Sequence, residues 1–319
     1  MTVEEAKKRV LQGGEMTKEE ALALSKAPLT ALQAAAREIR LARAGNTFDF
    51  CAILNGKSGR CSEDCKFCAQ SAHYPTNVET YPLLPEETMV QSALGMAARG
   101  VGRYAIVTSG RTIDEEETKK LCRVAAQICA QSRLSVCLSC GLLQEGQMRQ
   151  LKEAGVSRIH NNLESSRRFF PSICTTHTYE EKIATIQAAQ RVGLSVCSGG
   201  LFGLGETMED RIDLALTLRT LGIQHVPLNL LSPIPHTPYE NRKPLSPEEM
   251  ARTVALFRFL LPDGFLRLAG GRGLLPKQGE SCFWGGANAV ITGDLLTTAG
   301  ATVESDRAMV KRLGFEVVD

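Results

Sequence analysis

The pattern that most constrains the fold of this chain is an alternation of short apolar runs with longer amphipathic segments, which continues from residue 48 to residue 313. Short runs rich in Val, Ile, Leu and Phe predict buried strands, and apolar residues at helical spacing predict the helices that connect them. The expected strands are Phe48–Leu54, Arg103–Thr108, Leu134–Ser139, Val156–Asn162, Leu194–Gly200, His225–Leu230, Phe265–Leu268 and Ala287–Thr292. The expected helices are Glu86–Arg99, Asp114–Gln131, Gln144–Glu153, Tyr179–Val192, Met208–Leu221, Pro247–Leu261, Lys277–Phe283 and Val303–Leu313. Eight such units predict an α/β fold, a (β/α)₈ TIM-type barrel over residues 46–319, in which catalytic groups lie at the C-terminal ends of the strands.

Residues 1–45 are expected to form a helical N-terminal extension. Thr17 and Glu20 have the spacing of a capping box, Pro28 interrupts the pattern, and Leu29–Arg43 is rich in Ala, Leu and Arg. The start of the chain is charged and lacks the apolar centre of a signal peptide, and no run approaches the ~20 apolar residues of a membrane helix. We therefore expect a cytoplasmic protein that does not interact with a membrane.

The charged residues give no sign of a polyanionic partner. Lys and Arg number 37 against 35 Asp and Glu, and the basic residues are scattered without interleaved aromatics, so we expect no binding of nucleic acid. The chain has 11 cysteines and no secretory signal. This combination predicts reduced thiols that bind metal or take part in catalysis, not a disulfide framework.

Three cysteines follow the first expected strand, where a barrel places its active site. Cys61, Cys65 and Cys68 are separated by three and then by two residues. Three thiolates at this spacing can hold a [4Fe–4S] cluster and leave its fourth iron open to a small chelating molecule. A zinc site is the alternative, with His73 as a further ligand, but structural zinc sites usually show paired C-x-x-C elements and no second pair follows.

Three further cysteines lie in expected barrel strands. Cys137 and Cys140 are at the end of the third strand and Cys197 is in the fifth, so these thiols could meet inside the barrel and hold a second iron–sulfur site. The alternative is that they pack as small apolar side chains, which is common for buried cysteine. That is also our interpretation of the remaining cysteines, Cys51, Cys122, Cys129, Cys174 and Cys282.

The spacing of the first three cysteines resembles the signature of the radical S-adenosylmethionine (SAM) enzymes, in which SAM fills the open iron site, and the aromatic Phe67 fits that signature. From about residue 46 onward the chain resembles one family among them, biotin synthase. The matching segments are Cys61–Ser71, His160–Glu164, Thr175–Tyr179, Val196–Gly200, Gly203–Glu206, Val226–Asn229, Leu266–Arg272, Cys282–Asn288 and Leu295–Thr298.

The resemblance implies a set of SAM contacts. It assigns Cys61, Cys65 and Cys68 to the SAM cluster, and it places Asn162 and Glu164 against the SAM ribose, where a carboxylate can accept from both hydroxyls. Lys182 stands where the family usually has an Arg that faces the SAM carboxylate; it keeps the charge and loses the bidentate fork.

The resemblance also implies the substrate contacts. Asn229 matches a residue that hydrogen-bonds the ureido ring of dethiobiotin, for which a side-chain amide is suited, and Asn162 lies close to the same ligand. Thr297 and Thr298 match a pair near the carboxylate tail of the substrate.

The chain departs from the family at the second cluster, which is usually a [2Fe–2S] held by three Cys and one Arg. Cys137, Cys197 and Arg267 match, but the remaining Cys position aligns with Ala105. Cys140 is the candidate replacement, which requires the strand to end between it and Cys137, since side chains three apart in a strand point to opposite faces. A larger cubane-like cluster with a non-cysteine position on one iron is the resulting hypothesis. For Arg267 the alternative role is an ion pair with a buried carboxylate.

The reaction that the resemblance implies is sulfur insertion into dethiobiotin to form biotin, started by a 5′-deoxyadenosyl radical from SAM. It further implies flavodoxin or ferredoxin as electron donor and favours a homodimer. One alternative is another radical SAM barrel enzyme, such as a hydrogenase maturase or a methylornithine synthase, against which Asn229, Arg267 and Thr297 with Thr298 argue. A non-catalytic iron–sulfur carrier is the other alternative, and it would not need a SAM pocket.

Overall fold

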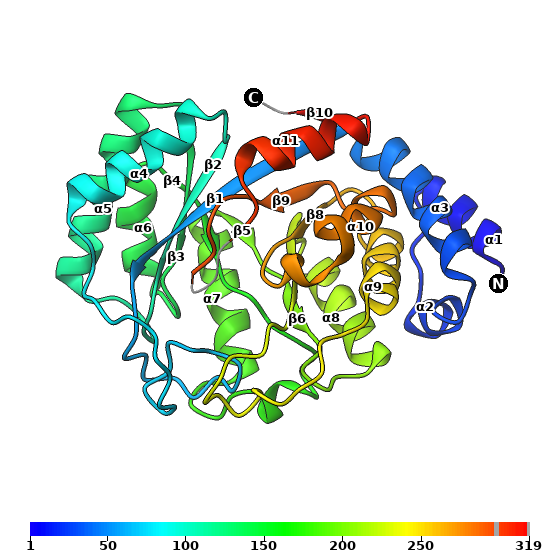
Figure 1. Cartoon of the computed structure of the whole chain (residues 1–319), viewed down its shortest axis with the longest axis horizontal. Coiled ribbons are helices and arrows are strands. Elements are labelled where there is room, and N and C mark those ends of the chain that lie inside the picture. The colour runs from blue at the N-terminus through cyan, green and yellow to red at the C-terminus, as the bar shows by residue number, and fades with distance from the viewer. Residues whose placement is uncertain (297–299, 318–319) are drawn as a thin grey trace.

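The structure of the chain is a computed structural model that describes residues 1–296 and 300–317 (Figure 1). Its centre is a barrel of parallel strands: β1 Thr47–Lys57, β2 Arg103–Thr108, β3 Ser135–Ser139, β4 Val156–His160, β5 Ser195–Cys197, β6 Gly200–Phe202, β7 His225–Leu230, β8 Phe265–Leu268 and β9 Ala289–Ile291. The barrel closes where β9 pairs with β1 through Asp49 opposite Ala289. The (β/α)₈ prediction is confirmed, with β5 and β6 together filling the fifth position.

The fifth strand is broken, whereas the sequence predicted one run over Leu194–Gly200. The segment after β4 inserts at the break: the Glu164 N–H donates to the Gly199 carbonyl (3.1 Å), and the Glu164 carbonyl accepts from the Leu201 N–H (2.9 Å). Gly199 also lies against β7, since a Cβ there would be 1.9 Å from the Pro227 carbonyl oxygen. The long-range contact with Glu164 therefore ends β5 early.

Helices cover the outside of the barrel (Figure 1). They are α4 Glu86–Ala98, α5 Glu115–Gln131, α6 Glu145–Glu153, α7 Tyr179–Val192, α8 Met208–Thr220, α9 Pro247–Leu260 and α11 Val303–Arg312. The predicted helix over Lys277–Phe283 is wrong in its first half, because Lys277 and Gln278 have φ of 49° and 56°. The guanidinium of Arg272, in the turn η3 (Arg272–Leu274), donates to the Gln278 carbonyl (3.4 Å). This turn is followed by η4 (Pro276–Gly279) and the short helix α10 (Glu280–Trp284).

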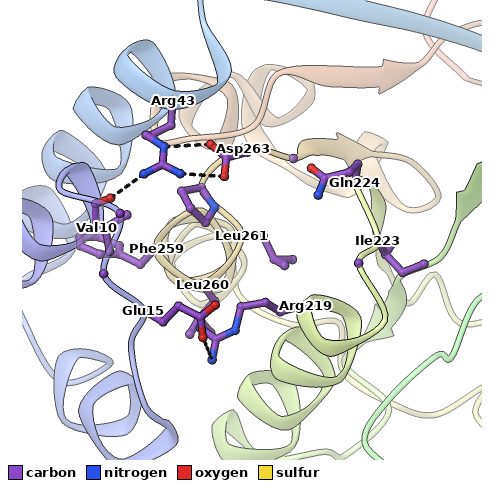
Figure 2. A pocket seen from close by; sticks show the side chains of 15 residues that line it. Val10, Glu15, Arg43, Arg219, Ile223, Gln224, Phe259, Leu260, Leu261 and Asp263 are labelled. Atoms are coloured by element: carbon purple, nitrogen blue, oxygen red, sulfur yellow. Dashed lines mark hydrogen bonds and ion pairs between the residues drawn. The ribbon is translucent and has the colours of Figure 1, made fainter.

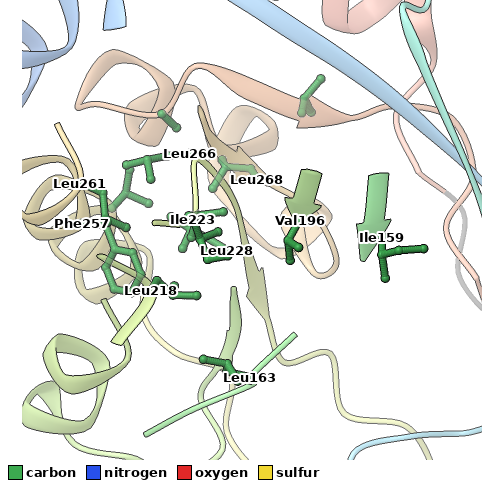
Figure 3. Close-up of a cluster of buried hydrophobic side chains, with 14 of the residues drawn as sticks. Ile159, Leu163, Val196, Leu218, Ile223, Leu228, Phe257, Leu261, Leu266 and Leu268 are labelled. Atoms are coloured by element: carbon green, nitrogen blue, oxygen red, sulfur yellow. The ribbon is translucent and has the colours of Figure 1, made fainter. Parts of the chain in front are cut away.

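The apolar core lies between the barrel strands and these helices. Figure 3 shows Leu228 and Leu266 of the strands on the side of Leu218 of α8 and Phe257 of α9, and Val196 of β5 belongs to the same cluster. All five side chains are buried. This packing holds the strands in register, so that the inward-facing side chains are fixed relative to one another.

The N-terminal extension consists of α1 (Val3–Leu11), α2 (Lys18–Leu24), α3 (Leu29–Ile39) and a π-helical turn, η1 (Arg40–Ala44). The expected capping box of Thr17 and Glu20 begins α2. Arg43 joins the extension to the barrel, because it donates to both carboxylate oxygens of Asp263 (2.8 and 2.9 Å) and to the Val10 carbonyl (3.0 Å) (Figure 2). At the other end of the described chain, β10 (Glu316–Val317) pairs with the start of β1.

None of the helices that the structure describes is both long and apolar enough to cross a membrane.

Candidate iron–sulfur active site

A cavity of about 360 Å³ lies inside the barrel. Alternate residues of a strand point to the same face, and the barrel turns one such set inward. The inward set that lines the cavity is Cys51, Ile53, Arg103, Ala105, Val107, Cys137, Ser139, Arg158, His160, Cys197, Asn229, Arg267 and Ile291. Phe67 and Cys68 of the cysteine loop line the same cavity, so the loop and the barrel thiols share one space.

The cysteine loop folds back on itself through its backbone. The Cys61 N–H donates to the Gln70 carbonyl (2.9 Å), and the Cys61 carbonyl accepts from the Ala72 N–H (2.8 Å). Inside this closed loop, the Cys68 N–H donates to the Cys65 carbonyl (3.0 Å). All three cysteines are half-buried. The backbone hydrogen bonds hold them in one closed loop that follows the C-terminal end of β1. A donor set of three thiols on a fixed loop fits an iron–sulfur cluster with one open iron.

Two acidic residues inside the loop tie it to the segment after β4. Asp64 accepts from the Thr175 N–H (2.8 Å) and the Thr176 N–H (3.2 Å). Burial opposes ionisation of Asp64, but these bonds and that from the Thr175 hydroxyl hold the pKa of its carboxyl well below the usual range. Glu63 accepts from Arg111 (3.2 Å) and faces His177 Nδ1 (2.6 Å).

The residues expected to bind SAM lie beside this loop. The Asn162 side-chain oxygen accepts from the Gly199 N–H (3.0 Å), and its amide donates to Glu164 (3.5 Å). Glu164 has a left-handed backbone with φ of 67°, and burial raises the pKa of its carboxyl. Lys182 of α7 donates to Asn161 (3.4 Å). Its positive charge acts to lower the pKa of both Cys65 and Glu164, against the effect of burial.

Of the residues expected to bind substrate, Asn162 and Asn229 line the cavity. Asn229 is held by the backbone on both sides. Its amide donates to the Gly200 carbonyl (3.0 Å), and its oxygen accepts from the Gly270 N–H (2.9 Å). A carboxamide has two donors and two acceptor positions, so one of each remains for a ligand. Thr297 and Thr298 lie outside the described residues; the preceding Leu295 and Leu296 line the cavity.

The thiols deeper in the barrel are Cys51, Cys137 and Cys197. Ala105, the position where the family has a cysteine, is opposite Cys137 on the neighbouring strand. Cys51 of β1 packs against both Ala105 and Cys137. Cys51 was predicted to pack as a small apolar side chain, and it is found in the wall of the cavity. Cys51 and Ile53 are two apart in β1 and therefore point to the same face. The sequence alone does not say that this face is the inner one.

Cys140 is not brought to this group. Strand β3 ends at Ser139 as the ligand hypothesis required, but the turn carries Cys140 into the main apolar core, where it is fully buried. Burial raises the pKa of the Cys140 thiol to about 12, and the polar groups that act on it are Thr108, Glu117 and Lys57. The turn is fixed because Gly141 packs against the Arg111 carbonyl.

The floor of the cavity carries three arginines. Arg267 forms an ion pair with Asp49, as the alternative role predicted, and Arg158 donates to His225 Nε2 (2.6 Å). Arg103 Nε, Arg158 Nη1 and Arg267 Nε are buried and have no hydrogen-bond partner among the described residues. Buried donors without partners are costly. Arg103 and Arg267 share one carboxylate, Asp49, so positive charge and free donors remain. An anionic group in the cavity, such as thiolates with bound iron and sulfide, would satisfy both.

The electrostatics at Cys197 agree with that fit. Burial alone would raise the pKa of the Cys197 thiol, but a hydrogen bond with His160 and the charges of Arg267 and Arg158 lower it to about 7. Burial raises the pKa values of the Cys51 and Cys137 thiols, because the nearby arginine charges offset only part of its effect. Among the three deep thiols, Cys197 is therefore the one whose surroundings favour the thiolate.

Comparison with known proteins agrees with this geometry. A model of the radical SAM superfamily matches residues 57–218, and a model of the biotin and thiamin synthesis associated domain matches residues 227–316. Biotin synthase from Akkermansia muciniphila is 53% identical over 309 residues, which cover 97% of this chain and 96% of the relative. The chain belongs to the biotin synthase family. A second biotin synthase, from Clostridium botulinum, is 49% identical and covers 98% of each chain.

Solved structures of lower identity share the fold of this biotin synthase family member. Methylornithine synthase superposes with a TM-score of 0.85 at 17% identity, covering 98% of this chain and 97% of the other. The maturase HydG from Carboxydothermus hydrogenoformans gives 0.83 at 15% identity, covering 99% and 79%. Membership of the radical SAM superfamily implies a [4Fe–4S] cluster and SAM, and the loop of Cys61, Cys65 and Cys68 is the donor set that fits them.

Proposed function

We propose that this chain inserts sulfur into dethiobiotin to form biotin, with SAM as radical source and an auxiliary iron–sulfur cluster as sulfur source. One observation carries the proposal: a single cavity joins the cysteine loop to the deep thiols Cys51, Cys137 and Cys197, with Asn229 in its wall. A substrate in that cavity has a radical source on one side and sulfur on the other. Such positioning is the protein's main contribution when cofactors supply the chemistry.

The side chains at the mouth would bind SAM. Held by Cys61, Cys65 and Cys68, the cluster would supply the electron that cleaves SAM to a carbon radical. Glu164, whose backbone is fixed between β4 and β6, accepts from the ribose hydroxyls, and Asn162 orients Glu164 through its amide. Lys182 supplies the positive charge for the SAM carboxylate.

The wall of the cavity would bind dethiobiotin. Asn229 offers its remaining N–H and its remaining lone pair to the ureido ring, because its other two positions are held by the backbone of Gly200 and Gly270. The apolar side chains of Ile53, Val107 and Leu231 line the same cavity. They exclude water from the reacting carbon atoms.

The auxiliary cluster would be held by Cys51, Cys137 and Cys197, beside Arg267. Cys51 replaces the cysteine that the family carries at the position of Ala105, and it does so from β1, the strand next to β2. Because Arg267 is engaged by Asp49, we keep the hypothesis of a larger cubane-like cluster with a non-cysteine position on one iron. Mössbauer spectra that show only a [2Fe–2S] beside the SAM cluster would rule out the larger assembly.

A reductant of the flavodoxin or ferredoxin class would supply the electron, and a homodimer is the expected assembly. Titration with each reduced protein and light scattering of the loaded enzyme test these two points.

The function is tested by anaerobic turnover of the reconstituted protein with SAM, a reductant and dethiobiotin, with mass spectrometry of biotin and 5′-deoxyadenosine. We expect both products from the unchanged chain and from Cys129→Ser, whose thiol is exposed on α5, and neither from Cys61→Ser. Cleavage of SAM without biotin from a chain that carries both clusters would contradict the proposed substrate. Biotin without SAM cleavage would contradict the radical mechanism.

A further inference from the structure

A second group of metal-ligating side chains lies next to the cysteine loop. The ligand atoms of Cys65, Cys174 and His177 all lie within 4.8 Å of one another, the one such group found among residues 1–296 and 300–317. Cys174 Sγ is 3.3 Å from His177 Nδ1. Both residues are buried, at 2% and 7% exposure. They come from the segment after β4, more than a hundred residues from Cys65, and the sequence predicted only a packing role for Cys174.

The spacing of this group suits one metal ion and not a cluster. In a tetrahedral zinc site the Zn–S distance is about 2.3 Å and the Zn–N distance about 2.0–2.1 Å, so neighbouring ligand atoms are roughly 3.5–3.8 Å apart. Cys61 and Cys68 are not part of the close group. His73, the further ligand of the zinc alternative, is instead bound to the Ser62 carbonyl (2.9 Å).

A carboxylate beside the group is the candidate fourth ligand. Glu63 Oε2 is 2.6 Å from His177 Nδ1 but lies outside the group whose ligand atoms are all within 4.8 Å, so this carboxylate reaches a bound ion only after a shift of its side chain. Glu63 is oriented by Arg111 (3.2 Å) and by the Thr176 hydroxyl (2.9 Å). Oriented outer groups of this kind are typical of sites that bind metal tightly.

We propose that the cluster-free chain binds one thiophilic divalent cation, of which Zn²⁺ is the type, through Cys65, Cys174 and His177, with Glu63 in the fourth position. Binding is redox-neutral: the ion replaces the two thiol protons, which are released to solvent. Because Cys65 is also a ligand of the proposed SAM cluster, the ion and that cluster exclude one another. Zinc binding itself does not rest on the proposed function; only the exclusion does.

The first experiment measures the affinity of the cluster-free full-length chain for Zn²⁺ against a chromophoric chelator, and the spectrum of the Co²⁺ form. We expect one tight equivalent and the charge-transfer bands of tetrahedral thiolate ligation. Cys174→Ser should weaken Zn²⁺ binding about 100-fold or more, since loss of an outer partner alone costs 10–100-fold. Cys61→Ser and the exposed control Cys129→Ser should leave the affinity unchanged. His177→Gln should shift the Co²⁺ bands.

The opposite pattern, with tight binding in Cys174→Ser and loss in Cys61→Ser, would overturn the proposal, because it would place the ion on the three-cysteine loop. Tight binding in both variants would also overturn it.

The second experiment tests exclusion by loading Zn²⁺ before anaerobic reconstitution and counting iron. The unchanged chain should take up about four fewer irons than zinc-free protein, the content of one [4Fe–4S] cluster. Cys174→Ser should take up the full amount in both cases. Equal iron uptake with and without tightly bound zinc would refute the exclusion and the role of Cys65 in the cluster, while the binding site would stand or fall on the first experiment.

Discussion

The proposal that Cys51, and not Cys140, is the third thiol of the auxiliary cluster predicts opposite effects for alanine at these two positions. Cys51 lines the cavity, whereas Cys140 is fully buried in the apolar core. Alanine at position 51 enlarges the existing cavity and removes a proposed ligand. Alanine at position 140 removes no ligand and leaves a void in close-packed surroundings. The two variants should therefore separate cluster content from stability.

The magnitudes follow from these two environments. Removal of one sulfur from the core at Cys140 should cost about 1 kcal/mol of unfolding free energy, comparable to deletion of a buried methylene, and lower the Tm by about 2 °C. Removal at Cys51 should cost less than about 0.5 kcal/mol, because no new cavity forms in the core. The iron content should fall by at least about two per chain in Cys51→Ala, since even the smaller [2Fe–2S] is lost, and stay unchanged in Cys140→Ala.

The assay is anaerobic reconstitution, with iron and sulfide counts and Mössbauer spectra, beside urea unfolding of the cluster-free chains. A third variant adds Ala105→Cys to Cys51→Ala. Position 105 faces the same cavity opposite Cys137, so this change should restore the iron that the single variant lost. Loss of auxiliary iron in Cys140→Ala together with full iron in Cys51→Ala would refute the assignment.

Three further predictions concern the scaffold. Burial opposes ionisation of Asp210, but the hydrogen bonds it accepts hold its pKa below the usual value. The ionised Asp210 therefore stabilises the fold fully above about pH 4, and this stability is lost as the pH falls through the folded-state pKa. Between pH 6 and pH 3 the urea midpoint of the unchanged chain should fall more than that of Asp210→Asn. Equal falls in the two chains would contradict this. Asp306→Ala leaves the buried Arg272 charge without its bidentate partner, so unfolding free energy should drop by about 3–5 kcal/mol, and a drop below 1 kcal/mol would show that the pair is not needed. Gly199→Ala places a Cβ 1.9 Å from the Pro227 carbonyl oxygen, so it should lower the Tm, and an unchanged Tm would show that the break between β5 and β6 can move.

The sequence predicted the barrel because the alternation of strand and helix is a local signal repeated along the chain. It did not predict the break at Gly199, which depends on Glu164, a residue far away in the chain. The same limit applies to the site. Cys61, Cys65 and Cys68 are recognisable from spacing alone.

The deep thiols are harder to assign because parallel strands are buried on both faces, so the alternation does not say which cysteine points inward. The sequence predicted packing for Cys51 and a ligand role for Cys140, whereas Cys51 lies on the inner face of β1 and the turn at Gly141 carries Cys140 into the apolar core. The proximity of Cys174 to Cys65 was not predictable, because Cys65 belongs to another loop, far away in the chain.

The arginine floor has a consequence for the order in which the cavity is filled. Arg103, at the start of β2, and Arg267 pair with Asp49 near the start of β1, so among the described residues these charges line the end of the cavity that lies away from Phe67 and the cysteine loop. Whatever sits deepest has to enter first. Iron and sulfide for the lower site would pass the mouth before SAM and substrate, and replacement sulfur would arrive only after both had left. If the proposed auxiliary cluster gives up its sulfur, its rebuilding therefore requires an empty active site after each turnover.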